Sequence, residues 1–163
     1  MKSFALSSPQ FHALAAIREI AARHAWTGGV EVVEGTLFYH VPLREHPDVC
    51  GVIFAMDDEG ENLQLYLLLP ARMDACRIGD AYEFAARHGH GRRFGALEMS
   101  AEHGTLRIRM DADIAADSVG ETVSRLVDRG MALAHDVSAA WRALCWPPNH
   151  PRAQRDISEI ANS

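Results

Sequence analysis

The chain has 163 residues, 48% of them hydrophobic, and a formal net charge of −6. These values are typical of one soluble globular domain, and the acidic balance, with a single lysine, argues against a surface that follows nucleic-acid phosphates. The sequence holds no apolar run of the roughly 18 residues that a membrane-spanning helix requires, so we expect neither nucleic acid nor a membrane as a partner.

The first predicted element is a helix over residues 9–24. Ser8 followed by Pro9 matches a capping hydroxyl and a proline in the first helical turn. Apolar residues then recur at three- and four-residue steps and form one stripe: Phe11, Leu14, Ile17, Ile20 and Ala21.

Four strands are predicted next, at residues 30–33, 36–43, 50–56 and 62–70. Glu34 and Gly35 predict a two-residue turn between the first two strands. An acidic run predicts the turn between the last two.

The hairpin formed by residues 50–69 is apolar on both faces. Alternate residues from Cys50 to Met56, and from Leu63 to Leu69, share one face. Strands that are apolar on both faces need cover on both; a helix supplies one cover, and we expect a second subunit or a partner to supply the other. The predicted partner-binding residues lie on that second face: Ile53, Ala55, Tyr66 and Leu68.

A second helix is predicted at 73–88, followed by a hairpin of strands at 94–100 and 105–111. In the last strand Arg107 and Arg109 alternate with apolar residues, so one face of this hairpin is expected to be exposed to water. The apolar positions point inward: Leu106, Ile108 and Met110.

The longest predicted helix comes last. Ser118 and Glu121 match a capping box, and an apolar stripe continues from there to about Cys145. Gly130 lies on the stripe, where a missing side chain lets a neighbouring strand or helix approach closely. Two prolines end the helix, and a polar tail follows at 147–163.

The segment HGHGRRFG, at 88–95, suggests a corner between helix and hairpin more strongly than a ligand site. Its GxGxxxG spacing follows a helix and precedes a strand, the reverse of the order in a dinucleotide-binding loop. We therefore expect Gly89 or Gly91 to end the helix in a left-handed conformation and Gly95 to let the strand bend.

Two other hypotheses for this segment stay open. His88, His90 and His103 are weak candidates for a metal site, because no HExxH motif and no paired cysteines accompany them. Arg92 and Arg93 are candidates to hold an anion or a partner's carboxylate. No nucleophile motif such as GxSxG occurs, so we expect no catalytic residue and no cofactor.

Three dispersed cysteines, Cys50, Cys76 and Cys145, form no CxxC pair. Such a set is typical of reduced thiols in a cytosolic protein, most often small buried apolar groups. The N-terminal segment has one lysine and a very short apolar patch, which does not match a secretory signal. We therefore expect a cytoplasmic location.

The stretch AYEFAARHGHGRRFGALEMSAEHGTLRIRMDADI and the helix after it resemble the bacterial YbjN family. The resemblance spans about residues 37–146, with Gly104 at the family's hairpin turn and a departure at Gly89 and His90, where the family often has Asn and Tyr. The matching positions are Glu83, Phe84, Arg87, Gly91, Arg93, Phe94, Gly95, Glu98 and Met99. The resemblance to this family implies an α+β fold like that of type III secretion chaperones. It also implies a protein that is often dimeric and has a regulatory role.

The expected fold is an antiparallel sheet flanked by helices, in the order α-β-β-β-β-α-β-β-α, within one domain at 1–146. The expected function is a non-catalytic, cytosolic regulatory or protein-interaction module of YbjN type, which forms a homodimer and binds a protein partner. One alternative is a dedicated type III secretion chaperone for an effector. The second is a metal- or ligand-binding protein that uses the three histidines at 88, 90 and 103.

Overall fold

The computed structural model describes residues 6–57, 59, 61–114 and 119–146. Its helices are α1 (Ser8–Arg23), α2 (Ile78–Gly89) and α3 (Val119–Cys145), with a short 3₁₀ helix at Ala75–Arg77. Its strands are β1 (Gly29–Val33), β2 (Thr36–Pro42), β3 (Gly51–Met56), β4 (Asn62–Arg72), β5 (Ala96–Ser100) and β6 (Thr105–Asp113). The predicted α+β class and the predicted order of elements are confirmed.

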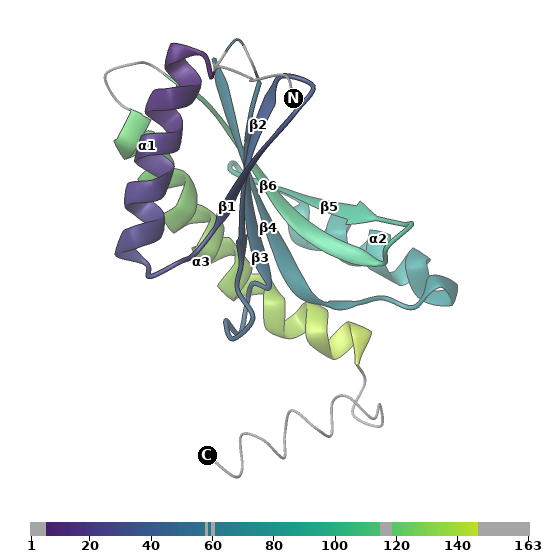
Figure 1. Cartoon of the computed structure of the whole chain (residues 1–163). Coiled ribbons are helices and arrows are strands. Elements are labelled where there is room, and N and C mark those ends of the chain that lie inside the picture. The colour runs from purple at the N-terminus through teal and green to yellow at the C-terminus, as the bar shows by residue number, and fades with distance from the viewer. Residues whose placement is uncertain (1–5, 58, 60, 115–118, 147–163) are drawn as a thin grey trace.

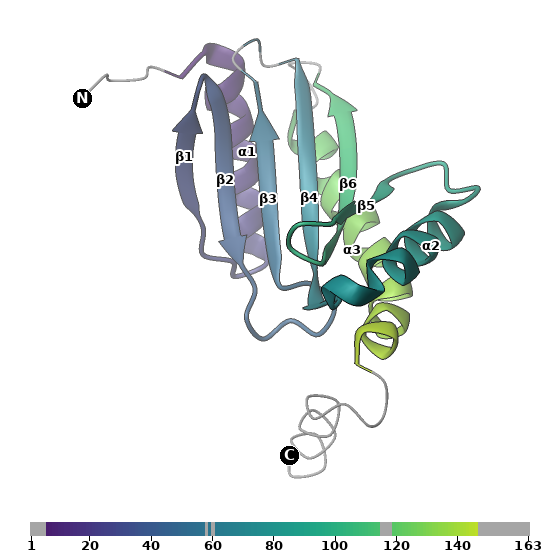
Figure 2. The same cartoon turned by 90° about the vertical axis from the view of Figure 1, so that its right-hand side faces the viewer.

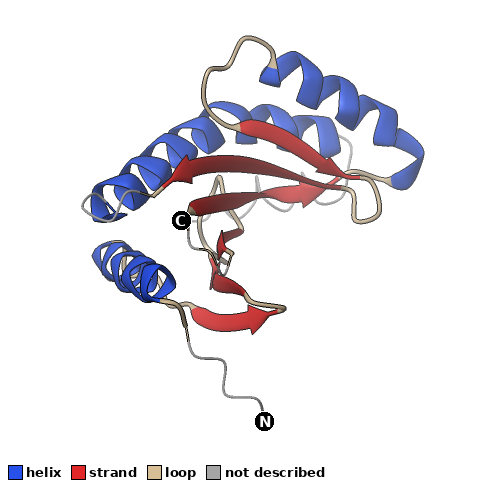
Figure 3. Ribbon diagram, turned by 90° about the horizontal axis from the view of Figure 1, so that it is seen from above, coloured by secondary structure: helices blue, strands red, loops and turns tan. Residues whose placement is uncertain are grey.

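The six strands form one antiparallel sheet in the order β1-β2-β3-β4-β6-β5. Each of the first three connections is a hairpin or short loop, so these strands are neighbours in both sequence and space (Figure 2). Strand β6 pairs with the other edge of β4, and β5 pairs with β6 at the end of the sheet. Seen from above, the sheet twists strongly along its length (Figure 3), as antiparallel sheets normally do.

Helices α1 and α3 lie side by side on the same face of the sheet (Figure 1). Helix α2 does not join this layer over the middle of the sheet. It packs against β5 and the C-terminal part of α3, where the rings of Phe84 and Trp141 lie 5.5 Å apart. The two faces of the central strands therefore have different surroundings.

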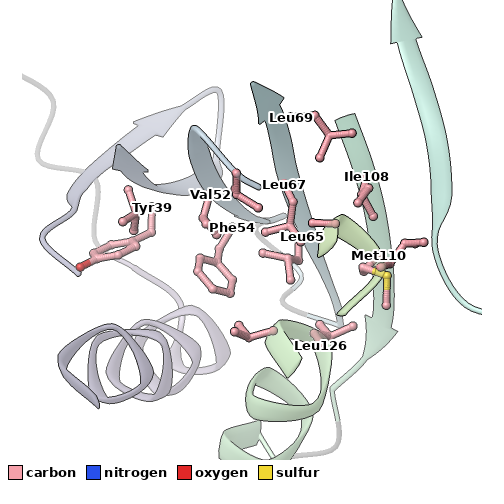
Figure 4. Packing of buried hydrophobic residues seen from close by; sticks show 14 of the residues in the cluster. Tyr39, Val52, Phe54, Leu65, Leu67, Leu69, Ile108, Met110 and Leu126 are labelled. Carbon is pink, nitrogen blue, oxygen red and sulfur yellow. The ribbon is translucent and has the colours of Figure 1, made fainter. Parts of the chain in front are cut away.

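The core lies between the sheet and the α1–α3 layer. Figure 4 shows Leu65, Leu67 and Leu69 of β4 together with Val52 and Phe54 of β3. None of these side chains is more than 2% exposed. Burying one such side chain stabilises a fold by about 1.5–3 kcal/mol, so this layer contributes a large share of the stability.

Helix α1 begins at a capping box one residue earlier than predicted. The N-cap is Ser7, whose hydroxyl accepts from the backbone of Gln10, while the Gln10 side chain accepts from the backbone of Ser7. Gln10 is buried, and its Nε2 donates to the carbonyls of Gly35 at 2.9 Å and Asp57 at 2.8 Å. One amide thus ties the helix start to two hairpin turns. Phe11, predicted on the apolar stripe, is 62% exposed instead.

The close approach predicted at Gly130 is confirmed. A Cβ at this position would lie 2.7 Å from Cδ1 of Leu67 on β4, which is far inside van der Waals contact. Helix α3 therefore reaches the sheet only because this residue has no side chain.

The second helix begins later than the predicted residue 73. Strand β4 continues to Arg72 with a register shift after Leu68, and Ala71 has a φ of +82°. Proline at position 70 lacks the N–H that a regular ladder needs, so the strand ends irregularly. A 3₁₀ turn at Ala75–Arg77 then precedes α2.

The predicted corner at residues 88–95 is confirmed. Helix α2 ends at Gly89, and the left-handed residue after it is Gly91, with a φ of +73°. Gly95 has a φ of +78°, and a Cβ there would lie 2.6 Å from Sδ of Met110. The corner therefore needs glycine both for its turn and for its contact with β6.

All three cysteines are free, but only Cys145 is buried, so the prediction of buried thiols is wrong for Cys50 and Cys76. Cys50 directly precedes β3, where its Sγ donates to the carbonyl of Leu69 at 3.6 Å, and Cys76 lies in the 3₁₀ turn. Burial raises the pKa of the Cys145 thiol to about 12.

Two predictions lie outside the described residues: the capping hydroxyl of Ser118 and the polar tail at 147–163. Among the helices that the structure describes, none combines the length and the apolar character needed to cross a membrane.

Candidate functional site

The face of the sheet opposite α1 and α3 is the candidate site, and we call it the open face. None of the described helices lies over its central strands, as Figure 2 shows from that side. The pairing registers place its side chains in three rows across the strands. The rows are Glu31–Phe38–Ala55–Gln64–Asp111, then His40–Ile53–Tyr66–Arg109, then Leu68–Arg107–Glu98.

The apolar half of the open face lies on β2, β3 and β4. It contains all four residues predicted to bind a partner. Ile53, Tyr66 and Leu68 are half-buried by their neighbours, whereas Ala55 is only 5% exposed. Leu68 lies across Gly51, where an added Cβ would be 3.3 Å from its Cδ1. The structure therefore brings the four residues together on one surface and leaves three of them partly in contact with solvent.

The charged half of the open face lies on β5 and β6. Glu98 accepts from Arg107 at 2.8 Å and from Arg109 at 3.3 Å, and Asp111 accepts from Arg109 at 3.0 Å. Hydrogen bonds to Asp111, and then to Glu98, raise the pKa of Arg109 above its usual value. The charged half is thus a ladder of ion pairs that contains side chains of both signs.

The two halves meet at Tyr66. The guanidinium carbon of Arg107 lies 4.5 Å from the centroid of its ring, a cation–π distance. The Tyr66 hydroxyl donates to Oε1 of Gln64 at 2.7 Å. The ring is therefore fixed in orientation and presents a defined surface rather than a mobile one.

Phe38 and His40 belong to the same face but were not among the predicted site residues. Their rings stack with centroids 5.9 Å apart. Nε2 of His40 lies 3.7 Å from Glu31, beyond hydrogen-bond length, and has no hydrogen-bond partner among the described residues. The signal was present in the sequence, because Leu37, Tyr39 and Val41 alternate with them and are buried.

The structure separates the two candidate arginines of the corner. Arg92 donates to the carbonyl of His88 at 2.6 Å and lies 3.9 Å from a carboxylate oxygen of Asp136, so it serves the fold. Arg93 is exposed and lines a cavity between the corner, β6 and α3.

The three candidate histidines are used separately. His88 stacks on Phe84 with centroids 4.1 Å apart, and the His90 backbone N–H caps α2. His103 lies in the β5–β6 turn, 3.1 Å from the hydroxyl of Ser100. Within the described residues, no group of three or more histidine, cysteine or acidic side chains could hold a metal ion.

Asp48, His135 and Ser138 bring together the residue types of a hydrolase triad, but in a different arrangement. Asp48 stands in the middle and accepts from the Ser138 hydroxyl and from Nδ1 of His135, the latter at 2.9 Å. Ser138 is fully buried, so no substrate reaches its oxygen. In a triad, histidine takes the serine proton; here the three residues fasten the β2–β3 loop to α3.

The open face can therefore supply apolar contact, a fixed aromatic ring and charges of both signs, which are the components of a protein-binding surface. No protein-family model matches the chain, and no curated protein matches it significantly.

Proposed function

We propose that this chain is a non-catalytic protein-interaction module that binds a partner through the open face. The resemblance to the YbjN family, which stays a prediction, agrees with such a role. The observation that carries the proposal is the partly exposed apolar half of the open face on β2–β4, which none of the described helices covers. Apolar side chains gathered on one uncovered sheet face favour association, because burying them removes apolar surface from water.

The charged ladder beside the apolar half favours a second copy of the chain as one occupant. In a two-fold symmetric interface the same patch meets itself. Arg107 and Arg109 of one copy would then face acidic groups such as Glu98 and Asp111 of the other. A homodimer formed in this way would satisfy charges and apolar contact together.

Light scattering after size-exclusion chromatography tests the homodimer. Wild type is expected at twice the chain mass at micromolar concentration. Ile53→Thr and Tyr66→Thr keep good strand propensity but remove apolar surface, and each should shift the equilibrium to monomer. Phe11→Ser removes a more exposed apolar side chain from α1 and should leave the dimer intact.

A strict monomer would leave a different protein as the occupant. In that case, purification from the native host should recover a protein with wild type and with Phe11→Ser but not with Ile53→Thr. Equal recovery of a protein with wild type, Phe11→Ser and Ile53→Thr, or no recovery with any of the three, would contradict the proposal. If the protein recovered is one that the cell secretes, the module acts as a secretion chaperone.

We expect the interaction to take place in the cytoplasm. Three free cysteines, two of them exposed, fit a reducing compartment, because exposed thiols tend to form disulfides in an oxidising one.

A further inference from the structure

A cavity of about 390 Å³ lies between the corner at residues 91–95, strand β6 and helix α3. It is separate from the apolar half of the open face. Four arginines line it: Arg93, Arg109, Arg125 and Arg129. A smaller adjacent cavity of about 320 Å³ shares Arg93, Phe94 and Arg129. The volume suits a small ligand or a single modified side chain.

Three of these arginines have no carboxylate partner among the described residues. The ion pairs near the cavity use Arg92 and Arg109, and none uses Arg93, Arg125 or Arg129. Glu121 and Asp128 lie four residues before and three residues after Arg125 on α3, which are pairing positions on a helix. Arg125 nevertheless forms an ion pair with neither of them, and it is one of the residues that line the cavity.

Arg129 is positioned by an aromatic ring. Its guanidinium carbon lies 4.1 Å from the ring centroid of Phe94, whose side chain is 57% exposed. A guanidinium stacked on a ring keeps its edge N–H groups free to donate. The lining of the cavity thus combines a held donor group with an exposed aromatic surface.

The acidic side chains of the cavity do not cancel its charge. Asp111 accepts from Arg109 at 3.0 Å, and Asp113 accepts from the Asn62 amide at 3.5 Å. The ion-pair network of Arg107 and Arg109 with Glu98 and Asp111 is neutral. The other three arginines of the lining against Asp113 leave a local excess of two positive charges in a chain whose net charge is −6. Such a local excess favours a dianion, because Arg forks donate in pairs to phosphate oxygens.

We infer that this cavity binds a phosphate monoester, held by Arg93, Arg125 and Arg129, with the organic part of the ligand against Phe94. A phosphate monoester carries a charge of about −1.5 to −2 at pH 7, which matches the local excess. The site borders the charged half of the open face, with which it shares Arg109 and Asp111, whereas the three proposed phosphate ligands lie outside that face.

Ligand-observed NMR with phenyl phosphate tests the inference. Wild type should bind it saturably at millimolar concentration, and phenol, which has the ring without the phosphate, should not compete. Arg125→Gln and Arg93→Gln should each weaken binding about tenfold, the effect of losing one charge-assisted contact. Arg18→Gln removes the same charge from the exposed side of α1, outside the cavity lining, and should bind like wild type.

A change of pH and a ligand with a single charge test whether the cavity prefers a doubly charged phosphate. Binding should be tighter at about pH 7.5 than at about pH 5, because the phosphate gains its second charge near pH 6 while arginine stays charged. Benzoate, with a single charge, should bind more weakly; equal binding would overturn the assignment to phosphate. Failure of phenyl phosphate to bind, or binding that Arg125→Gln and Arg93→Gln leave unchanged, would overturn the site. Circular dichroism melts confirm that the variants are folded.

A phosphotyrosine peptide identifies the source of the phosphate. Tighter binding of the peptide than of phenyl phosphate would assign a phosphate carried by a protein, and equal binding would assign a small molecule. Both results support the site.

Discussion

Arg107 lies over the ring of Tyr66, 4.5 Å from its centroid, where the apolar strands of the open face meet the charged ones. Glu98 accepts a hydrogen bond from Nε of Arg107 at 2.8 Å. The contact explains why a tyrosine stays ordered on a face that no described helix covers. It also places an aromatic anchor at the centre of the proposed interface, where such residues contribute most to binding.

Gly130→Ala should destabilise the fold by about 1–3 kcal/mol. The added methyl would lie 2.7 Å from Leu67, in the layer between α3 and the sheet, and the contact must be relieved by moving packed groups. Urea unfolding measures the loss. Gly120→Ala, in the first turn of the same helix with no atom within 4 Å of its Cβ position, is the control and should change stability by less than about 0.5 kcal/mol. Equal effects of the two substitutions would contradict the packing described.

Gly104→Ala should cost more than Gly130→Ala, about 3 kcal/mol or more. Its φ is +64°, and a Cβ would lie 2.3 Å from the backbone carbonyl oxygen of Met73, which cannot rotate away as a side chain can. Thermal unfolding should show the difference. Gly79→Ala, in an open position at the start of α2, provides the matched control. A melting temperature for Gly104→Ala close to that of wild type would show that the turn is not held against Met73.

His135 should make stability depend on pH. Its hydrogen bond to Asp48 raises the pKa of His135 above the ordinary value of 6.5. Burial acts to raise the pKa of Asp48, but hydrogen bonds from Ser138 and His135 outweigh it, and the net pKa falls below 3.8. Asp136 and Arg142 add smaller charge effects.

These two pKa shifts make the free energy of unfolding depend on pH in opposite directions. A raised histidine pKa stabilises the fold below about pH 6.5, and the effect is lost as pH rises through the folded value. A lowered aspartate pKa stabilises above about pH 3.8. The melting temperature of His135→Gln should therefore fall furthest below wild type at about pH 5–6 and approach it above about pH 8. His12→Gln, an exposed histidine on α1, should show no such trend, and a constant difference for His135→Gln would argue against the pair.

Local patterns were enough to predict most of the fold. The alternation at residues 105–111 placed Leu106, Ile108 and Met110 inward, and all three are buried. Gly130 was identified from its place on an apolar stripe. The second helix was predicted too early because its start depends on the irregular end of β4 at Ala71, which no periodicity reveals.

The candidate sites depend on tertiary placement. The apolar second face of β3 and β4 could be read from alternation, but not the position of α2, which packs beside β5 and leaves that face uncovered. Arg93 is separated by more than thirty residues from Arg125 and Arg129. Only the docking of the corner against α3 brings them around one cavity.

Photo-crosslinking in the native host tests the central claim, that another polypeptide covers the open face. Benzoylphenylalanine replaces Tyr66 in one variant and Tyr82 in another. Tyr82 lies on α2 and is 50% exposed, more than Tyr66, so nonspecific crosslinking would be more frequent from position 82. We expect one discrete adduct from position 66, either at twice the mass of the chain or as a constant larger species, and none from position 82. No adduct from position 66, or the same adducts from both positions, would contradict it.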